Sequence, residues 1–154
     1  MTPRKRYWMM KSEPDAFSID DLARVGTEPW TGVRNYQARN FMRDDMQVGD
    51  GVLFYHSSCP QPGIAGIARI AGEVYPDPTA LDPHSHYHDP KASAEKNPWS
   101  ALDVEFVEAF DEVLPLQHLK NNPLLAELAL VQRGSRLSVM PVAESEWTAI
   151  LAMR

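Results

Sequence analysis

The sequence contains a single cysteine, Cys59, and no long run of apolar residues. A lone cysteine excludes a disulfide within the chain and suits a reducing compartment. Lys11 and Glu13 follow the basic N-terminal residues too closely to leave room for the apolar segment of a signal peptide. No stretch approaches the roughly 20 apolar residues that a membrane-spanning helix needs. We therefore expect a cytoplasmic protein that does not enter a membrane.

The short motifs typical of common catalytic sites are also missing. The sequence has no phosphate-binding Walker loop, no nucleophile elbow (G-x-S-x-G), no dinucleotide-binding G-x-G-x-x-G and no zinc-binding H-E-x-x-H. It has neither an internal repeat nor a low-complexity segment. The residues therefore give no indication of an enzyme, and we predict no catalytic residue and no cofactor.

A net charge of −6 argues against nucleic-acid binding that is driven by overall charge. The charge is unevenly distributed along the chain. Residues 4–43 contain eight Lys and Arg against five Asp and Glu, whereas the other residues contain seven against sixteen. A basic N-terminal quarter on an acidic body would permit a local contact with phosphate.

The length and the apolar patterns predict one domain over residues 1–154, with short strands and helices inserted between them. Strands are predicted at residues 7–10, 51–57, 64–75, 103–110 and 136–142. Helices are predicted after Ser18, from Asn35 to Asp44, at residues 116–120, after Asn122 and at residues 144–152. Residues 76–99 are rich in Pro, Asp and His and are expected to form a long loop. This order predicts an α+β domain built around a curled sheet or barrel.

Residues 30–39 combine an aromatic, a glycine and an asparagine with the start of a helix that carries arginines. Trp30 offers a flat face for stacking, and the amide of Asn35 offers donors and an acceptor for the edge of a base. The N-terminus of the helix would favour an anion. In the alternative interpretation, Trp30 belongs to the core and Asn35 only caps the helix.

Two further segments place polar side chains where a ligand could lie. Ser12 follows the first predicted strand, although it could belong to an ordinary loop. In the last predicted strand, alternation places Leu137 and Val139 on one face and Arg136 and Ser138 on the other. The polar pair then either faces solvent or lines a cleft.

Histidines and the cysteine support a rival hypothesis, a metal- or small-metabolite-binding protein or an enzyme. Three histidines at alternate positions in residues 84–88, with Asp82 and Asp89 beside them, could share a metal ion. They lie in a loop and lack a second group of ligands, so adventitious affinity is the simpler interpretation. His56 lies close to Cys59 in the sequence, but catalytic Cys–His pairs are set by the fold and seldom lie so near one another along the chain. We predict no specific metal site.

The ordered motifs of this chain closely resemble those of the EVE domain family. They lie at residues 11–14 (Lys-Ser-Glu-Pro), 30–41, 49–57, 62–66, 75–79 and 133–139. The departures are small. Thr31 stands where an acidic residue is common, residues 97–99 lack an arginine often found before the tryptophan, and Met140 replaces a frequent glutamine.

This resemblance implies a PUA-like fold, a mixed β-barrel with peripheral helices, which is related to the YTH and ASCH domains. It also implies a non-enzymatic module that binds a modified base in DNA or RNA, with methylated or hydroxymethylated cytosine as the leading suggestion. The positions that match the family's pocket are Ser12, Trp30, Val33, Asn35, Phe54, Tyr55, His56, Arg136 and Ser138.

We assign roles to these residues by their chemistry. Trp30 would stack on a base that has left its helix, and Val33 would line the recess for a methyl group. Asn35, Ser12 and Ser138 would bond the edge of the base, while Arg34 and Arg39, like Arg136, would contact phosphate or brace the pocket. A third interpretation is an interaction domain in which this pocket is vestigial.

Overall fold

A computed structural model describes residues 5–133 and 137–154 of the chain. Arg136, one of the residues assigned to the pocket, lies outside these ranges. Within them, no helix is both long enough and apolar enough to cross a membrane.

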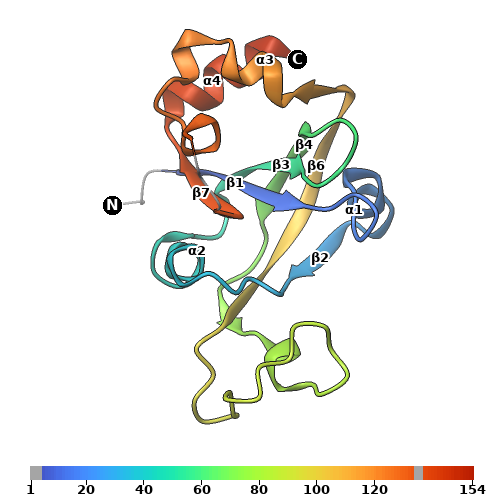
Figure 1. Cartoon of the computed structure of the whole chain (residues 1–154), viewed down its shortest axis with the longest axis vertical. Helices are drawn as coiled ribbons and strands as arrows, with labels where there is room; N and C mark the ends of the chain where they lie inside the picture. The colour runs from blue at the N-terminus through green and yellow to red at the C-terminus, as the bar shows by residue number, and fades with distance from the viewer. Residues whose placement is uncertain (1–4, 134–136) are drawn as a thin grey trace.

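Seven strands form one curled sheet (Figure 1). The strands are β1 (Tyr7–Ser12), β2 (Thr27–Trp30), β3 (Gly51–His56), β4 (Gly63–Ile70), β5 (Tyr75–Pro76), β6 (Ser100–Pro115) and β7 (Val139–Val142). Their order is β2-β6-β4-β3-β1-β7, with β5 paired to β6. β1 and β3 run parallel, and the remaining pairs are antiparallel. In the part of the chain that the structure describes, the edge strands β2 and β7 do not pair, so the α+β class is confirmed but a closed barrel is not formed.

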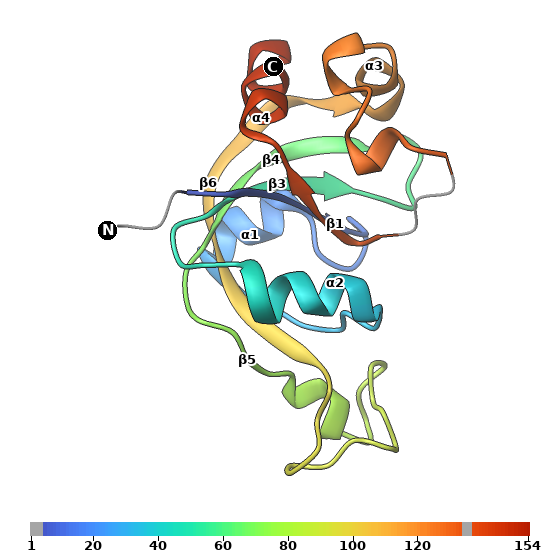
Figure 2. The same ribbon diagram turned by 90° about the vertical axis from the view of Figure 1, so that its left-hand side faces the viewer.

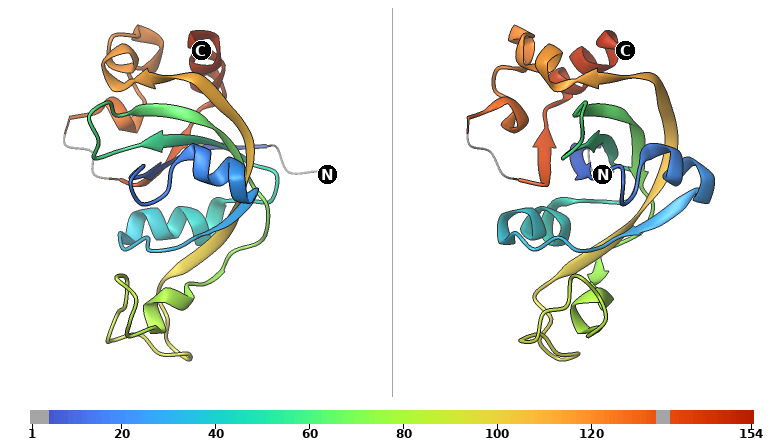
Figure 3. Two further views of the ribbon diagram at one scale, coloured as in Figure 1. Left: turned by 90° about the vertical axis from the view of Figure 1, so that its right-hand side faces the viewer. Right: turned by 45° about the vertical axis from the view of Figure 1, so that its right-hand side comes forward.

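Helices lie around this sheet. The α-helices are α1 (Ile19–Val25), α2 (Tyr36–Asn40), α3 (Leu116–Lys120) and α4 (Glu144–Met153). The tighter or wider turns are η1 (Phe41–Asp45, a π-helical turn) and the 3-10 helices η2 (Pro78–Leu81), η3 (Pro123–Leu125) and η4 (Ala129–Val131). Figures 2 and 3 show α3 and α4 together at one end of the molecule, α2 beside β1, and the loop with η2 at the other end.

Each face of the sheet has its own hydrophobic core, and β3 contributes to both. Val52 and Phe54 belong to the core that also contains residues of α1 and α2, which we call the α2-side core. Leu53 and Tyr55 belong to the core that also contains residues of α3 and α4, which we call the α3-side core. Because both faces are buried, β3 is a continuous apolar run rather than an alternating one.

The helix starts follow the predicted caps. At α1 the Ser18 hydroxyl accepts from the Asp21 N–H at 3.1 Å, and the Asp21 carboxylate accepts from the Ser18 N–H at 2.9 Å. At α2 the Asn35 Oδ1 accepts from the Ala38 N–H at 3.0 Å. The helix predicted to end at Asp44 is confirmed as α2 and its continuation η1.

Two strands differ in extent from the prediction. The strand predicted over residues 64–75 ends at Ile70, because the chain bends at Gly72 before the separate strand β5 begins. A bulge interrupts this strand, since the pairing of β4 with β6 shifts between Ile64 and Gly66. β6 is longer than the predicted 103–110, and its second half follows that shifted pairing.

β2 was not predicted, and the start of the last strand was predicted wrongly. Pro29 in β2 is a poor strand residue, but β2 lies at an edge of the sheet, where proline is tolerated. β7 begins only at Val139, after a bend at Ser138. Val139 therefore lies in the α2-side core while Leu137 packs against the α3-side core, so the two residues do not share a face.

Candidate functional site

The parallel strands β1 and β3 end with Ser12 beside His56, which are register partners. The Ser12 hydroxyl donates to the carbonyl oxygen of Phe17 at 2.6 Å. The Nε2 of His56 accepts from the N–H of Ile19 at 3.1 Å. Both side chains are thus fixed against the segment that leads into α1, and both are partly exposed.

The hydrogen bond from Ile19 sets the protonation of His56. A nitrogen that accepts an N–H carries no proton, so the neutral ring has its proton on Nδ1. Burial lowers the pKa of His56 below its usual 6.5, and the charge of Asp20 opposes this shift only in part. The imidazole is therefore held neutral, with Nδ1 as a donor.

Trp30 and Val33 are more deeply buried than residues that line a binding pocket usually are. Trp30 is 8% exposed and meets the ring of Phe54 edge-on, with the centroids 5.5 Å apart. Val33 is 4% exposed and Phe54 is fully buried. All three belong to the α2-side core, as the alternative interpretation of Trp30 expects. In this conformation a ligand could reach only a small part of Trp30.

Asn35 is exposed, and the cap of α2 uses only its carbonyl oxygen. No described residue accepts from its Nδ2. The side chain therefore combines both roles that the sequence left open. One half of the amide supports the helix, and the other half can donate to a ligand.

Arg34 braces the loop of residues 76–99 against the start of α2. Its guanidinium pairs with the buried Asp77 at 3.0 Å and donates to the carbonyl oxygen of Tyr87 at 2.6 Å and to Thr79 Oγ1 at 3.2 Å. Burial favours the neutral form of Asp77, but hydrogen bonds from Thr79, Gly32 and Arg34 outweigh it and hold the pKa of that carboxyl below its usual range. These contacts favour the bracing role of Arg34 over a phosphate contact.

The remaining pocket candidates are divided between the two faces of the sheet. Tyr55 lies in the α3-side core, on the face opposite Phe54 and His56. Ser138 lies in the bend before β7, and its carbonyl oxygen accepts from the N–H of Lys11 at 2.8 Å. The structure therefore brings Ser12 and His56 together and leaves Tyr55 on the other face.

The sequence matches the model of one protein family. The EVE domain model matches residues 6–153, almost the whole chain. This chain belongs to the EVE domain family. The resemblance drawn from the sequence motifs is confirmed.

Relatives of this EVE domain share its architecture over nearly its full length. Mouse thymocyte nuclear protein 1 is 40% identical over 166 residues, which cover 96% of this chain and 73% of the mouse protein. A crystal structure of a protein from Pseudomonas putida is 65% identical, covers 96% of this chain and 98% of its own, and gives a TM-score of 0.94. A crystal structure of human THYN1 in complex with DNA containing 5-methylcytosine is 38% identical, covers 97% of both chains, and gives a TM-score of 0.90.

An aromatic cluster beside Asn35 was missed by the sequence reasoning. Tyr36 is 58% exposed and stacks on Trp99, with the ring centroids 4.8 Å apart. The guanidinium of Arg39 lies 5.0 Å from the Tyr36 ring and donates to the carbonyl oxygen of Pro98. We call Tyr36, Arg39 and Trp99 the Tyr36 cluster. Trp99 is far from Tyr36 and Arg39 in the sequence, so only the docking of residues 76–99 on α2 assembles the cluster.

The histidine loop of this EVE domain shows no metal-binding arrangement. Among the described residues no group of three or more His, Cys, Asp or Glu side chains could hold a metal ion. Asp89 accepts from the indole N–H of Trp99 at 2.8 Å, and Asp82 accepts from the N–H of His84 at 2.9 Å. Both carboxylates thus hold the loop in shape.

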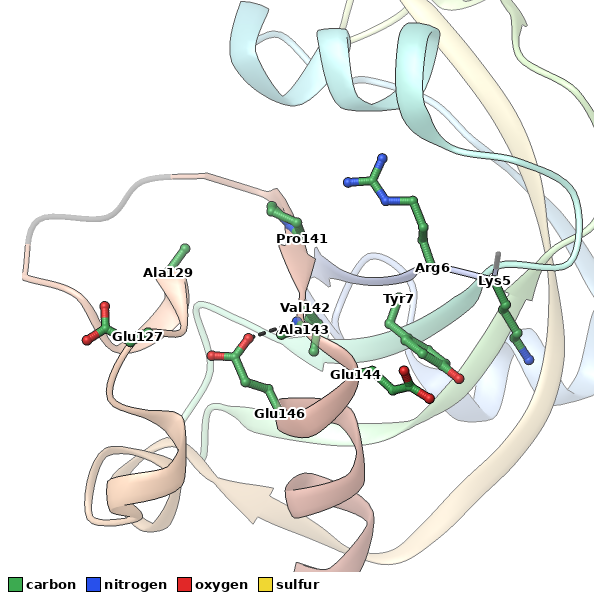
Figure 4. A pocket seen from close by; sticks show the side chains of 10 residues that line it. All are labelled: Lys5, Arg6, Tyr7, Glu127, Ala129, Pro141, Val142, Ala143, Glu144 and Glu146. Carbon is green, nitrogen blue, oxygen red and sulfur yellow. Dashed lines mark hydrogen bonds between the residues drawn. The ribbon is translucent and has the colours of Figure 1, made fainter. Parts of the chain in front are cut away.

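Several hollows open on the described surface, and Trp30 and Asn35 line none of the three considered next. The one in Figure 4 has a volume of 630 Å³ and mixes Lys5 and Arg6 with glutamates, among them Glu146 of α4. The Glu146 carboxylate accepts from the N–H of Ala143 at 2.8 Å, which ties it to the start of α4. A second hollow, lined by β6 and the C-terminal residues, is also of mixed charge. Charges of both signs give these two hollows no clear ligand.

Proposed function

We propose that this chain is a non-enzymatic module that binds DNA containing a modified base, with 5-methylcytosine as the first candidate. The likeness to human THYN1 in complex with 5-methylcytosine-containing DNA, over 97% of both chains, carries this proposal. The base would leave its helix and lie over the ends of β1 and β3, between the exposed edge of Trp30 and the side chains of Ser12, Asn35 and His56. RNA with the same modification would fit the same chemistry.

The unused hydrogen-bonding groups at these side chains complement cytosine. The Ser12 hydroxyl donates its hydrogen bond to the carbonyl oxygen of Phe17, so its oxygen still offers lone pairs. Asn35 Nδ2 and His56 Nδ1 carry N–H groups, because their partner atoms accept from the backbone. On its Watson–Crick edge, cytosine has one donor, the 4-amino group, and two acceptors, the ring nitrogen N3 and the carbonyl oxygen O2. One acceptor and two donors on the protein therefore match this base edge.

Energies show why several contacts have to act together. Extruding a base from a duplex costs a few kcal/mol, whereas stacking on one aromatic side chain returns about 1–3 kcal/mol. Trp30 presents little surface, so the hydrogen bonds at Ser12, Asn35 and His56 have to supply the rest. A recess beside Val33 would favour a methyl group by about 1–3 kcal/mol.

The Tyr36 cluster supports contact with a strand outside the pocket. Tyr36 is 58% exposed next to Asn35, and the guanidinium of Arg39 lies over its ring. Aromatic rings and arginines together are typical of surfaces that hold unpaired bases and their phosphates. We assign Arg39, rather than Arg34, to the phosphate next to the extruded base.

Among the described residues, the arrangement of Cys59 and His56 does not support a catalytic function. Cys59 has a partly exposed free thiol, and no hydrogen bond joins it to His56. The Nε2 of His56 is already used as an acceptor, so it is poorly placed to activate a nucleophile. A binding module accounts for the same residues without further assumptions.

Calorimetric titration with two DNA duplexes tests the proposal. The duplexes are identical except that one carries a single 5-methylcytosine. We expect the methylated duplex to bind about tenfold more tightly or better, since a methyl-sized recess discriminates to that extent. Equal affinity for both duplexes would overturn the proposal.

Ser12→Ala separates the pocket from the remaining surface. It removes the lone pairs offered to the base, and we expect it to lose most of the preference for the methylated duplex. The matched control is Ser145→Ala on α4, where the serine is exposed on the opposite side of the sheet. A Ser12→Ala variant that keeps the full preference would show that the base does not bind here.

A further inference from the structure

The third hollow lies at the ends of β1 and β3, on the face opposite the candidate base site. It has a volume of 760 Å³. Its lining comes from the strand ends, α3 and the segment after η3, and consists of Lys11, Tyr55, Leu116, Lys120, Ala126, Leu130, Val131, Gln132 and Arg133. In Figure 2, α3 lies on one side of these strand ends and α2 on the other.

All the charged residues that line this hollow are basic. They are Lys11, Lys120 and Arg133, and no aspartate or glutamate accompanies them. No described carboxylate forms an ion pair with any of the three. The chain has a net charge of −6, and the other two hollows have linings of mixed charge. By comparison, the purely basic lining of this hollow indicates an anionic ligand.

Lys11 is a half-buried cation in this hollow. Its ammonium lies 5.8 Å from the centre of the Tyr55 ring. Burial lowers the pKa of Lys11, and no neighbouring carboxylate among the described residues offsets this effect. An anion in the hollow would supply the missing partner charge and favour the charged amine.

The hollow and the candidate base site lie on opposite sides of the same two strand ends. Lys11 and Ser12 are consecutive in β1, and Tyr55 and His56 are consecutive in β3. Because side chains alternate along a strand, Lys11 and Tyr55 point to one face of the sheet, and Ser12 and His56 point to the other. A DNA strand whose extruded base contacts Ser12 and His56 has only to pass the ends of β1 and β3 to reach Lys11 and Tyr55.

We propose that Lys11, Lys120 and Arg133 form a second phosphate site, in addition to Arg39, that holds the nucleic-acid backbone flanking the extruded base. This inference rests on the proposed function, because it assigns a place to the strand that carries the base. Lysine and arginine side chains fix a strand in position without reading its sequence. The site therefore contributes affinity, and the pocket on the other face contributes selectivity.

The salt dependence of DNA binding tests this site. Each phosphate contact contributes about 0.7–0.9 to the slope of log affinity against log salt concentration. We expect Lys11→Gln, Lys120→Gln and Arg133→Gln, combined, to lower the magnitude of this slope by about 2 to 3. The affinity for the methylated and the unmodified duplex should fall by the same factor, so that their ratio is unchanged.

Lys5→Gln is the matched control for a lost charge. Lys5 lies just before β1, about 20 Å along the strand from Lys11. A slope unchanged in the triple variant, or lowered as much per charge by Lys5→Gln, would overturn the phosphate site. If the wild-type protein binds both duplexes equally, the proposal of a modified-base reader is overturned. The salt dependence of the triple variant still tests the phosphate site in that case. Absence of any salt-dependent DNA binding would overturn both.

Discussion

Asn35 joins a structural role and the proposed binding role in one amide. Its Oδ1 caps α2, and its Nδ2 is assigned to the base. We expect Asn35→Ser to keep the cap and the stability but to weaken binding of the methylated duplex about tenfold, as the loss of about 1.4 kcal/mol would. Asn35→Ala should lose the cap as well, with about 1 kcal/mol of stability. Urea unfolding and calorimetry on both variants check this, and loss of stability in Asn35→Ser would contradict it.

His56 makes folding sensitive to pH. Because burial lowers its pKa in the folded state, the unfolded chain takes up this proton at a higher pH than the folded one. The stabilisation is complete above the ordinary value of about 6.5 and is lost as the pH falls through the lower folded value. We expect the free energy of unfolding to decrease from about pH 7.5 to about pH 5.5. His56→Gln should flatten this decrease, and an identical pH dependence in both proteins would contradict the assignment.

At the level of single residues, the sequence predicted caps better than contacts between distant segments. Ser18 and Asn35 act on backbone groups three residues away, so their roles follow from local pattern. The stacking of Tyr36 on Trp99 depends on where residues 76–99 dock, and no local pattern contains that information. The face of Ser138 was unpredictable for a related reason, since a bend interrupts the alternation.

At the level of elements, the bulge in β4 requires a glycine. A Cβ on Gly66 would overlap the carbonyl oxygen of Glu108 and the side chain of Ile19, whereas a Cβ on Gly72 would meet open space. We expect Gly66→Ala to destabilise the fold by about 1–3 kcal/mol, as overpacking usually does. Gly72→Ala is the matched control and should change stability little. Thermal unfolding of both variants checks this, and equal stability would contradict the close packing of β4 on β6.

Elements with a strong local signal were predicted, and those defined by their neighbours were not. The helix at Leu116–Lys120 and the strand β3 have the predicted positions, because their apolar patterns are clear. β2 forms because β6 pairs with it. Glu28 and Pro29 are poor strand residues, so the sequence pattern does not indicate a strand here. β6 extends past its alternating part for the same reason, since β4 pairs with it through two shifts of register.

For the whole molecule, both faces of the sheet are buried, and both proposed binding surfaces lie at the ends of its strands. The α2-side core holds Trp30 and Phe54 beneath the candidate base site, and the α3-side core holds Tyr55 beneath the basic hollow. Two binding surfaces of different chemistry can therefore share one edge of the sheet. The overall acidity of the chain then leaves DNA few other basic surfaces to bind.

A crystal structure of this protein with a short duplex that carries one 5-methylcytosine tests the central claim most directly. We expect the methylated base to lie outside the helix, with its edge against Ser12, Asn35 and His56, and the flanking backbone toward Lys11. The account would be contradicted by a methylated base that stays stacked in the duplex, or by one that binds the protein away from the ends of β1 and β3.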